Sequence, residues 1–275
     1  MTSQETAVEG GLDEPTGLEP AQGALALAQP GDEHDRSDWE RAAAAVLRKA
    51  RRMGEDDDDA RVWDELARTT LDGISIAPLG TPELVADLPR TARPTRSGPW
   101  DIRAHLGAGA AKQVNEEALV DLNGGVTSLW VAAAPDTDFA ALLDGVFLDL
   151  APVVLDAGTG PDADPVATAR AFLDHVGDLE LHPGTNLGVP ASLASAELAA
   201  AARERGVLAF VVDATSVHDR GASDAQELGW SMKTAADYLR GLTGGSASMS
   251  VGEAAALVEF RYAVTDEQFT GIAKL

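Results

Sequence analysis

One stretch of the sequence places polar side chains where an enzyme of the βα-barrel type would use them. Asp213, Thr215, His218 and Asp219 follow directly on the apolar run Val207–Val212. The run lacks polar alternation, which is typical of a parallel strand buried on both faces. Barrel enzymes keep their catalytic residues where such strands end. His218 is therefore the first residue whose role has to be explained.

Three carboxylates occupy comparable positions at the ends of apolar segments. Asp149, Asp156 and Asp213 could together form a metal site or an acid–base site at a barrel mouth. The interpretation we favour is simpler, namely that they cap the following helices and backbone turns. We expect the remaining histidines of the α/β region, His105, His175 and His182, to be structural or exposed.

The chain around His218 predicts one strand–loop–helix unit of such a barrel. Gly221 interrupts the chain after the polar cluster, and a helical pattern runs from Ser223 to Leu239. A strand, a polar loop and a helix in this order form the repeating unit of a parallel βα fold.

Composition restricts the class of protein. The 275 residues carry 45 acidic and 21 basic side chains, a net charge of −24 that argues against a nucleic-acid partner or an anionic membrane surface. The absence of cysteine excludes disulfides and thiolate metal sites. No apolar run approaches the roughly 20 residues of a membrane span, and no signal sequence begins the chain. We expect a soluble, cytoplasmic protein.

The N-terminal part divides into two segments. Residues 1–38 are rich in acidic residues, Gly and Pro, which predicts a disordered acidic tail. Within it, Asp32, His34 and Ser37 approach a cobalamin-ligand pattern, but the glycine of that pattern is missing and we interpret the match as chance. Residues 39–98 are predicted to form a helix followed by an extended arm.

The predicted helix begins with a capping box of Ser37 and Glu40 and ends near Gly54. Its apolar face needs a cover, either the chain's own barrel or a partner subunit. A short helix follows at Arg61–Arg68, and then proline-punctuated, extended segments at Thr70–Leu79 and Pro82–Pro99.

Residues 99–275 alternate between strand and helix patterns, which predicts a parallel sheet with helical crossovers. The expected strands are Gly124–Ala132, Gly145–Asp149, Val153–Asp156, Leu179–Leu181, Val207–Val212 and Leu257–Ala263. The expected helices are Lys112–Leu122, Phe139–Leu143, Pro165–His175, Leu193–Arg205, Ser223–Leu239, one from Val251 and one at the end of the chain. About six strands make an incomplete TIM-type (β/α)8 barrel, since a closed one needs eight.

Several ordered motifs resemble the methylmalonyl-CoA mutase family. They are Thr70–Leu79, Pro99–Arg103, His218–Ala222 followed by Glu227 and Leu228, and Phe269–Lys274. The segment Leu148–Gly158 is more similar to the small, non-catalytic subunit of the bacterial heterodimer. The resemblance covers roughly residues 39–275. It implies an arm that embraces a partner subunit, a barrel that admits a CoA thioester, and a separate cobalamin domain, which we expect to be absent here because the chain ends before it.

The resemblance also identifies positions to check. His218 matches the family histidine that donates a hydrogen bond to the thioester oxygen. The catalytic tyrosine corresponds to Thr95, and the carboxylate-binding arginine falls in Asn186–Ser192, which contains none. The site is thus expected to be vestigial, because neither group is replaced by an equivalent.

We therefore expect a structural small subunit of the adenosylcobalamin-dependent mutase that interconverts methylmalonyl-CoA and succinyl-CoA. Its partner is then a large catalytic subunit that binds adenosylcobalamin and the acyl-CoA, with no cofactor on this chain. The alternative is a catalytic acyl-CoA mutase barrel whose cobalamin domain lies on a separate chain. A third hypothesis, a barrel hydrolase that uses the strand-end aspartates, requires a bound metal.

Overall fold

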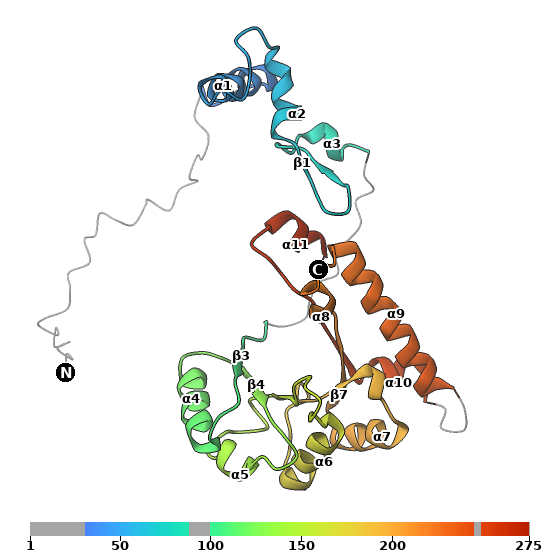
Figure 1. The fold of residues 1–275 in the computed structure, drawn as a ribbon. Helices are drawn as coiled ribbons and strands as arrows, with labels where there is room; N and C mark the ends of the chain where they lie inside the picture. Colours follow the sequence, from blue (N-terminus) through green and yellow to red (C-terminus); the bar gives the residue numbers. More distant parts are fainter. Residues whose placement is uncertain (1–30, 88–99, 245–248, 275) are drawn as a thin grey trace, which may run out of the picture. The chain divides into compact units, whose positions relative to one another are not determined.

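The computed structural model describes residues 31–87, 100–244 and 249–274, and these residues form two compact units. The first comprises residues 31–69 and 75–87, and the second residues 70–74 together with everything described from residue 100 onward. Figure 1 shows the small first unit and the larger α/β unit. Most of the predicted acidic tail, residues 1–30, lies outside the described part of the chain.

The first unit begins with helix α1, Arg36–Lys49. Its N-cap is Asp35, whose side chain accepts from the backbone N–H of Asp38, while the Asp38 carboxylate accepts from the Asp35 backbone N–H. This reciprocal capping box corrects the predicted box of Ser37 and Glu40, because an aspartate two residues earlier already satisfies the first free N–H groups. Glu40 instead pairs with Arg36 and accepts a hydrogen bond from the indole of Trp63.

The apolar face of α1 is covered from within its own unit. A 3-10 turn (η1, Asp59–Arg61) leads into α2 (Val62–Leu66). The buried members of this core are Ala44, Leu47, Met53 and Val62, with Trp39, Ala43, Trp63 and Leu66 packed around them. Helix α2 thus buries part of the apolar face of α1, while Val46 on the same predicted face stays 67% exposed. The alternative of docking on a partner subunit stays a prediction.

The predicted arm contains more regular structure than expected. Strands β1 (Arg68–Thr69) and β2 (Ser75–Ile76) pair antiparallel as a short hairpin, and α3 (Pro82–Val85) follows. Pro82 at the first turn of α3 suits a helix start, since the missing N–H would have no partner there. The rest of the irregular segment, residues 88–99, lies outside the described residues, and so does Thr95.

The second unit is built on a parallel sheet of six strands in the order of the sequence. They are β3 (Arg103–Leu106), β4 (Ser128–Ala132), β5 (Val153–Asp156), β6 (Asn186–Pro190), β7 (Leu208–Asp213) and β8 (Val258–Arg261). The sheet curls into an open half-barrel, so that the side chains of Arg103 on the first strand and Glu259 on the last form an ion pair. This α/β architecture agrees with the predicted incomplete TIM-type barrel.

The number of strands was predicted correctly, but three positions were not. Gly145–Asp149 forms turns, because Gly145 adopts a φ of 74° and leaves Phe147 exposed. The strand expected at Leu179–Leu181 lies instead at β6, and β3 was not predicted. β3 contains the polar residues Arg103 and His105, and Leu106 is its only buried apolar side chain. The sequence therefore lacks the apolar run that would indicate a strand.

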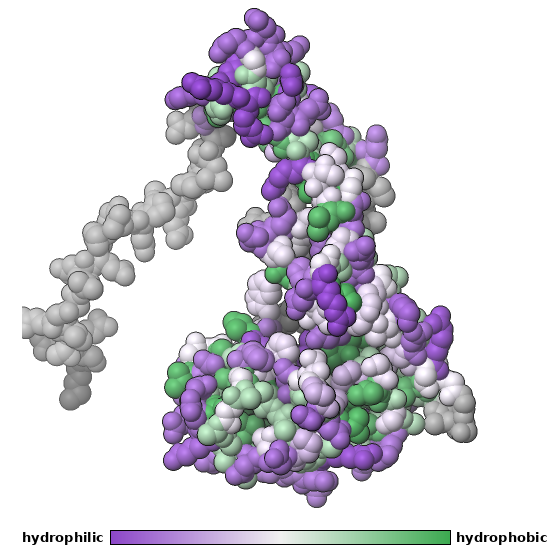
Figure 2. Space-filling view, viewed as in Figure 1, coloured by the Kyte–Doolittle hydropathy of each residue, from purple (hydrophilic) through white to green (hydrophobic). Residues whose placement is uncertain are grey.

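Helices of the second unit flank the sheet (Figure 1). They are α4 (Ala111–Asn123), α5 (Phe139–Leu142), α6 (Pro165–Val176), a 3-10 turn (η2, Ala191–Leu193), α7 (Ala196–Arg205), α8 (Thr215–His218), α9 (Asp224–Thr243), α10 (Val251–Ala255) and α11 (Gln268–Lys274). A single core of aliphatic and aromatic side chains, including Leu129, Phe172 and Phe210, lies between sheet and helices. The outer surface visible in Figure 2 is a mixture of hydrophilic and smaller apolar areas.

A bulge in β6 requires glycine. Gly188 has a φ of +69°, and its N–H donates to the side chain of Asn186, where the register of β6 against β7 shifts. A Cβ added here would lie 1.9 Å from the carbonyl oxygen of Leu155 on β5. Only glycine permits this approach of two strand backbones.

Candidate functional site

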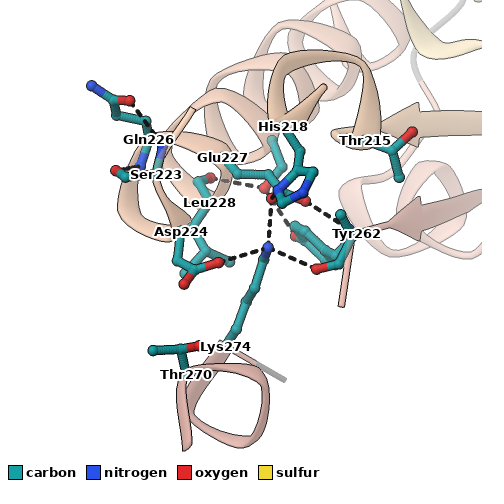
Figure 3. A network of polar contacts seen from close by, with 12 residues as sticks. Thr215, His218, Ser223, Asp224, Gln226, Glu227, Leu228, Tyr262, Thr270 and Lys274 are labelled. Atoms are coloured by element: carbon teal, nitrogen blue, oxygen red, sulfur yellow. Dashed lines mark hydrogen bonds and ion pairs between the residues drawn. The ribbon is translucent and has the colours of Figure 1, made fainter. Parts of the chain in front are cut away.

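His218 lies in a buried polar cluster between α8, α9 and α11, here called the peripheral cluster: His218, Asp224, Glu227 and Lys274. His218 ends the one-turn helix α8 that follows β7, as the predicted strand–loop–helix unit requires. Its Nδ1 lies 3.3 Å from Oε2 of Glu227, and its side chain is 29% exposed. Figure 3 shows the imidazole beside the carboxylate.

Glu227 is the centre of this cluster. Its side chain is fully buried, and its Oε1 accepts from the backbone N–H of Ala263 at 2.9 Å. Its Oε2 accepts from Nζ of Lys274, which also donates to Asp224 at 2.9 Å and to the carbonyl of Ala263 at 2.8 Å. A buried carboxylate is stable only with a cation and hydrogen-bond donors around it, and Glu227 has both.

Lys274 supplies that cation. Burial alone would lower the pKa of its ammonium group, but hydrogen bonds to Glu227 and Asp224 and their negative charges outweigh burial and raise the pKa. Since the side chain is only 2% exposed, the ammonium group holds α11 against α9 and the end of β8 (Figure 3). His218 thus faces a carboxylate that is already neutralised.

A tyrosine lies next to this cluster on the convex side of the sheet. The hydroxyl group of Tyr262 is 2.9 Å from Oγ of the buried Ser231 on α9, and its ring stacks on Phe260. Tyr262 follows β8, and Ser231 in turn donates to the carbonyl of Leu228. These contacts connect the end of β8 to α9.

The concave face of the half-barrel carries a second network, here called the concave cluster: Asp101, Arg103, Trp130, Glu259 and Arg261. Nη1 of Arg103 donates to both carboxylate oxygens of Glu259 at 3.1 Å, and Nη2 donates to Asp101. Nε of Arg261 also donates to Glu259, at 3.1 Å, and its guanidinium lies 4.4 Å from the ring centroid of Trp130. One carboxylate therefore links the first and last strands of the sheet.

Residues closer to the carboxyl ends of the strands continue this polar face. His105 packs edge-on against Trp130, and its Nε2 lies 3.4 Å from Asp156. A pocket of about 600 Å³ opens beside Asp156, at the ends of β3, β4 and β5. Its described lining consists of small apolar residues with Asp136, Asp138 and Asp156, and includes no basic side chain to bind a carboxylate or phosphate.

The strand-end aspartates mostly act as predicted, as acceptors for the following backbone. Asp213 accepts from the N–H and hydroxyl of Thr215, and Asp156 accepts from the N–H of Gly158. Asp149 lies in a turn and not at the end of a strand. Among the described residues, no group of three or more acidic, histidine or cysteine side chains is arranged to hold a metal ion.

The other predicted positions are spread over the unit. His175 lies in the last turn of α6 and stacks on Phe139, and Nδ1 of His182 accepts from the N–H of Gly184. The segment Asn186–Ser192, where the family arginine was expected, comprises β6 and a 3-10 turn. The sequence reasoning missed the concave cluster. The alternation of charged and apolar residues in Val258–Arg261 was the signal that could have revealed it.

Comparison with known proteins supports the resemblance seen in the motifs. A methylmalonyl-CoA mutase small subunit from Streptomyces virginiae is 35% identical in an alignment that covers 92% of this chain and 44% of that protein. The chain is a homologue of the methylmalonyl-CoA mutase small subunits. A probable small subunit from Mycobacterium tuberculosis (strain ATCC 25618 / H37Rv) is 34% identical over 88% of the chain and 44% of its own length. The small subunit of Propionibacterium freudenreichii subsp. shermanii is 28% identical over 91% and 43%.

The chain spans less than half the length of these small subunits. No protein-family model matches its sequence. In the described part of the chain, none of the helices combines the length and the apolar character that crossing a membrane would need.

Proposed function

We propose that this mutase small-subunit homologue is a structural, non-catalytic partner of a large catalytic subunit. The complex would isomerise methylmalonyl-CoA and succinyl-CoA with adenosylcobalamin held by the large subunit. The observation that carries the proposal is the concave cluster, whose Arg103–Glu259 ion pair spans the interior of the half-barrel.

An acyl-CoA that reacts inside a barrel has to pass through or lie within its interior. Here the interior is occupied by two guanidinium groups, one carboxylate and an indole ring in mutual contact. Displacing them would separate partly buried charges, which costs free energy that substrate binding would have to offset. The cluster therefore favours a closed interior over a substrate channel.

His218 supports the same proposal. To polarise a thioester carbonyl, an imidazole must donate into the barrel interior. The imidazole of His218 instead lies against Glu227 on the helix side, within a cluster held together by Lys274 (Figure 3). We infer that His218 is retained for packing and for its contact with the Glu227 carboxylate. The position of the missing tyrosine, Thr95, lies outside the described residues.

The sequence pattern that approaches a cobalamin ligand does not fit adenosylcobalamin. It contains His34, whose side chain is 71% exposed just before α1, next to Asp38. A lower ligand needs a histidine fixed in a pocket, with its second ring nitrogen oriented by a hydrogen bond. We assign the cofactor to the partner subunit and derive no chemical step on this chain.

The turn of the hairpin between β1 and β2 provides a surface for that partner. Leu71 and Ile74 in this turn are 89% and 62% exposed. Large apolar side chains that are exposed together are typical of protein interfaces. We propose that this part of the predicted arm contacts the large subunit.

Co-expression with a large mutase subunit, followed by size-exclusion chromatography and an isomerase assay, tests the proposal. We expect co-elution, and activity of the complex that is unchanged by His218→Gln. The double variant Leu71→Asp/Ile74→Asp should abolish co-elution, whereas Val120→Asp, a matched change at an exposed apolar residue of α4, should not. Failure of the wild-type chain to co-elute would refute the structural role. Isomerase activity of this chain with a separate cobalamin-binding protein alone would favour the catalytic alternative.

A further inference from the structure

The segment that joins β1 to β2 is a closed turn. Its residues Thr70–Ile74, here called the hairpin turn, belong to the second unit. The backbone N–H of Thr70 donates to the carbonyl of Ile74 at 2.9 Å, and the N–H of Ile74 donates to Oγ1 of Thr70 at 3.1 Å. Gly73 donates to the carbonyl of Thr70 at 3.0 Å with a φ of 78°, a conformation that suits glycine. These hydrogen bonds fix the backbone of the turn.

Asp72, in the middle of the hairpin turn, is bound to the start of α9. Its carboxylate accepts from the hydroxyl of Ser223, the N-cap of α9, and from the backbone N–H of Ala225 at 3.2 Å. The first N–H groups of a helix lack partners within the helix and carry partial positive charge, so a carboxylate is favourable there. Asp72 therefore acts as a second cap of α9, supplied from a distant part of the sequence.

The acidic side chains of α9 itself are bound to other groups. Asp224 accepts from Nζ of Lys274 at 2.9 Å, and Glu227 accepts from the same ammonium group and from the N–H of Ala263. Neither carboxylate can replace Asp72 at the N–H of Ala225 without giving up its contact with Lys274. Loss of the Asp72 carboxylate would thus release the hairpin turn from α9.

The hairpin turn also carries the two apolar side chains that we assign to the contact with the large subunit. Leu71 and Ile74 are both exposed, while Asp72 between them is held by α9. A turn that is fixed in this way presents its apolar side chains in one orientation, which lowers the entropy lost on binding. A released turn would adopt the binding orientation for a fraction of the time, and its apparent affinity would fall by that fraction.

We propose that Asp72 is a positioning residue for the partner contact: it fixes the hairpin turn on α9 and so presents Leu71 and Ile74 to an apolar pocket of the large subunit. This inference rests on the proposed function and adds the device that prepares the contact. It separates two kinds of variant. Loss of the apolar side chains removes the contact itself, whereas loss of Asp72 keeps these side chains but lets the turn move.

The test compares two properties of the same variants. Titration calorimetry measures the affinity for the large mutase subunit, and NMR of the ¹⁵N-labelled chain alone measures exchange of the Ala225 amide with solvent. In Asp72→Ala we expect about tenfold weaker affinity and at least about tenfold faster exchange, because both hydrogen bonds to α9 are lost. Asp72→Asn keeps one acceptor atom and should give intermediate values. Leu71→Ala/Ile74→Ala should weaken binding at least as much but leave the exchange of Ala225 unchanged.

Asp164→Ala is the matched control, because it removes a comparable cap elsewhere in the second unit. Asp164 is the N-cap of α6 and accepts from the N–H of Ala167 at 2.9 Å. This variant should lose stability, as N-cap variants do, with unchanged affinity for the large subunit. An equal fall in affinity for Asp164→Ala and Asp72→Ala would show that Asp72 acts through stability alone, and would overturn the proposal.

Ser223→Gly tests the same contact from the helix side if Asp72→Ala fails to fold. Glycine is tolerated at an N-cap, and the variant removes the hydroxyl that donates to Asp72. It should speed the exchange of Ala225 and weaken binding several-fold. Unchanged exchange or unchanged affinity in the folded Asp72 and Ser223 variants would overturn the proposal. A wild-type chain that does not bind the large subunit would instead refute the proposed function, and the exchange of Ala225 would still decide whether Asp72 holds the turn.

Discussion

The peripheral and concave clusters solve the same problem, a buried charge, to different degrees. In the peripheral cluster, Lys274 has three acceptors, and Glu227 is surrounded by a cation, an imidazole and a backbone N–H. In the concave cluster, Nη2 of Arg261 and Nε1 of Trp130 have no hydrogen-bond partner among the described residues, and in the peripheral cluster Nδ1 of His218 has none. The difference lies in the formal charges: the ammonium group of Lys274 has an acceptor for each of its three donors, whereas the guanidinium of Arg261 has a carboxylate on one side only.

The largest loss of stability is expected when the buried ammonium group of Lys274 is removed. Lys274→Met leaves Glu227 uncompensated at zero exposure, and breaking a buried ion pair costs roughly 3–5 kcal/mol. We expect the free energy of unfolding, measured by urea denaturation, to fall by about 3 kcal/mol, and the amides of α11 to lose protection from hydrogen exchange.

A double variant separates charge from packing in the same cluster. Lys274→Met/Glu227→Gln removes both charges and should recover most of the lost stability, because no buried charge is then left without a partner. Lys233→Met, on the exposed side of α9, is the matched control and should change little. Equal losses for Lys274→Met and Lys233→Met would contradict the role assigned to the peripheral cluster.

Glu259 is the carboxylate that Arg103 and Arg261 share in the concave cluster. Glu259→Gln keeps the shape but removes the charge that pairs Arg103 and Arg261. Because these side chains are 15–24% exposed and Arg103 retains Asp101, we expect a smaller loss, about 2 kcal/mol in urea denaturation. A loss as large as that of Lys274→Met would mean that the concave cluster is as self-contained as the peripheral one.

The two clusters should also respond to opposite ends of the pH scale. The pKa of Lys274 is raised, so its contribution is complete below the ordinary lysine value of 10.5 and is lost as the pH rises through the folded value. For Asp101, burial raises the pKa. Hydrogen bonds from Thr127 and Ser128 and the positive charge of Arg103 lower the pKa by more than burial raises it, so the pKa of Asp101 lies below its ordinary value.

The contribution of Asp101 is therefore complete above its ordinary value of 3.8 and is lost as the pH falls through the folded value. Hydrogen exchange of β3 and α11 as a function of pH measures the two effects separately. We expect β3 to lose protection first in acid and α11 first in alkali, with little change near neutrality. Simultaneous loss at one pH would show that the clusters are coupled.

The sequence predicted the parts of the fold that depend on local pattern. The apolar run before Asp213 predicted β7, and the helical pattern from Ser223 to Leu239 predicted α9, for which Ser223 is the N-cap. The strands that were missed or misplaced are β3, which has polar inward residues, and β6, which contains Gly188 and Pro190. Such residues argue against a strand until the curvature and the bulge that need them are known.

The clusters themselves depend on contacts that a sequence does not show. Glu227 and Lys274 are 47 positions apart, and Arg103 and Glu259 are 156 apart. His218 was singled out because of its place after β7, which is correct, but the direction of its side chain follows from the position of Glu227 one helix later. The order of strands and helices could be predicted from the periodicity of the sequence. The ion pairs could not, because they depend on how tightly the sheet curls.

The smallest loss of stability is expected for His218, the residue to which the sequence analysis gave most weight. In His218→Gln an amide replaces the imidazole beside Glu227 while Lys274 still supplies the charge, so the free energy of unfolding should fall by at most about 1 kcal/mol. Urea denaturation of this variant next to Lys274→Met ranks the two neighbours of Glu227. A loss for His218→Gln that matches or exceeds that of Lys274→Met would make the imidazole the main partner of Glu227.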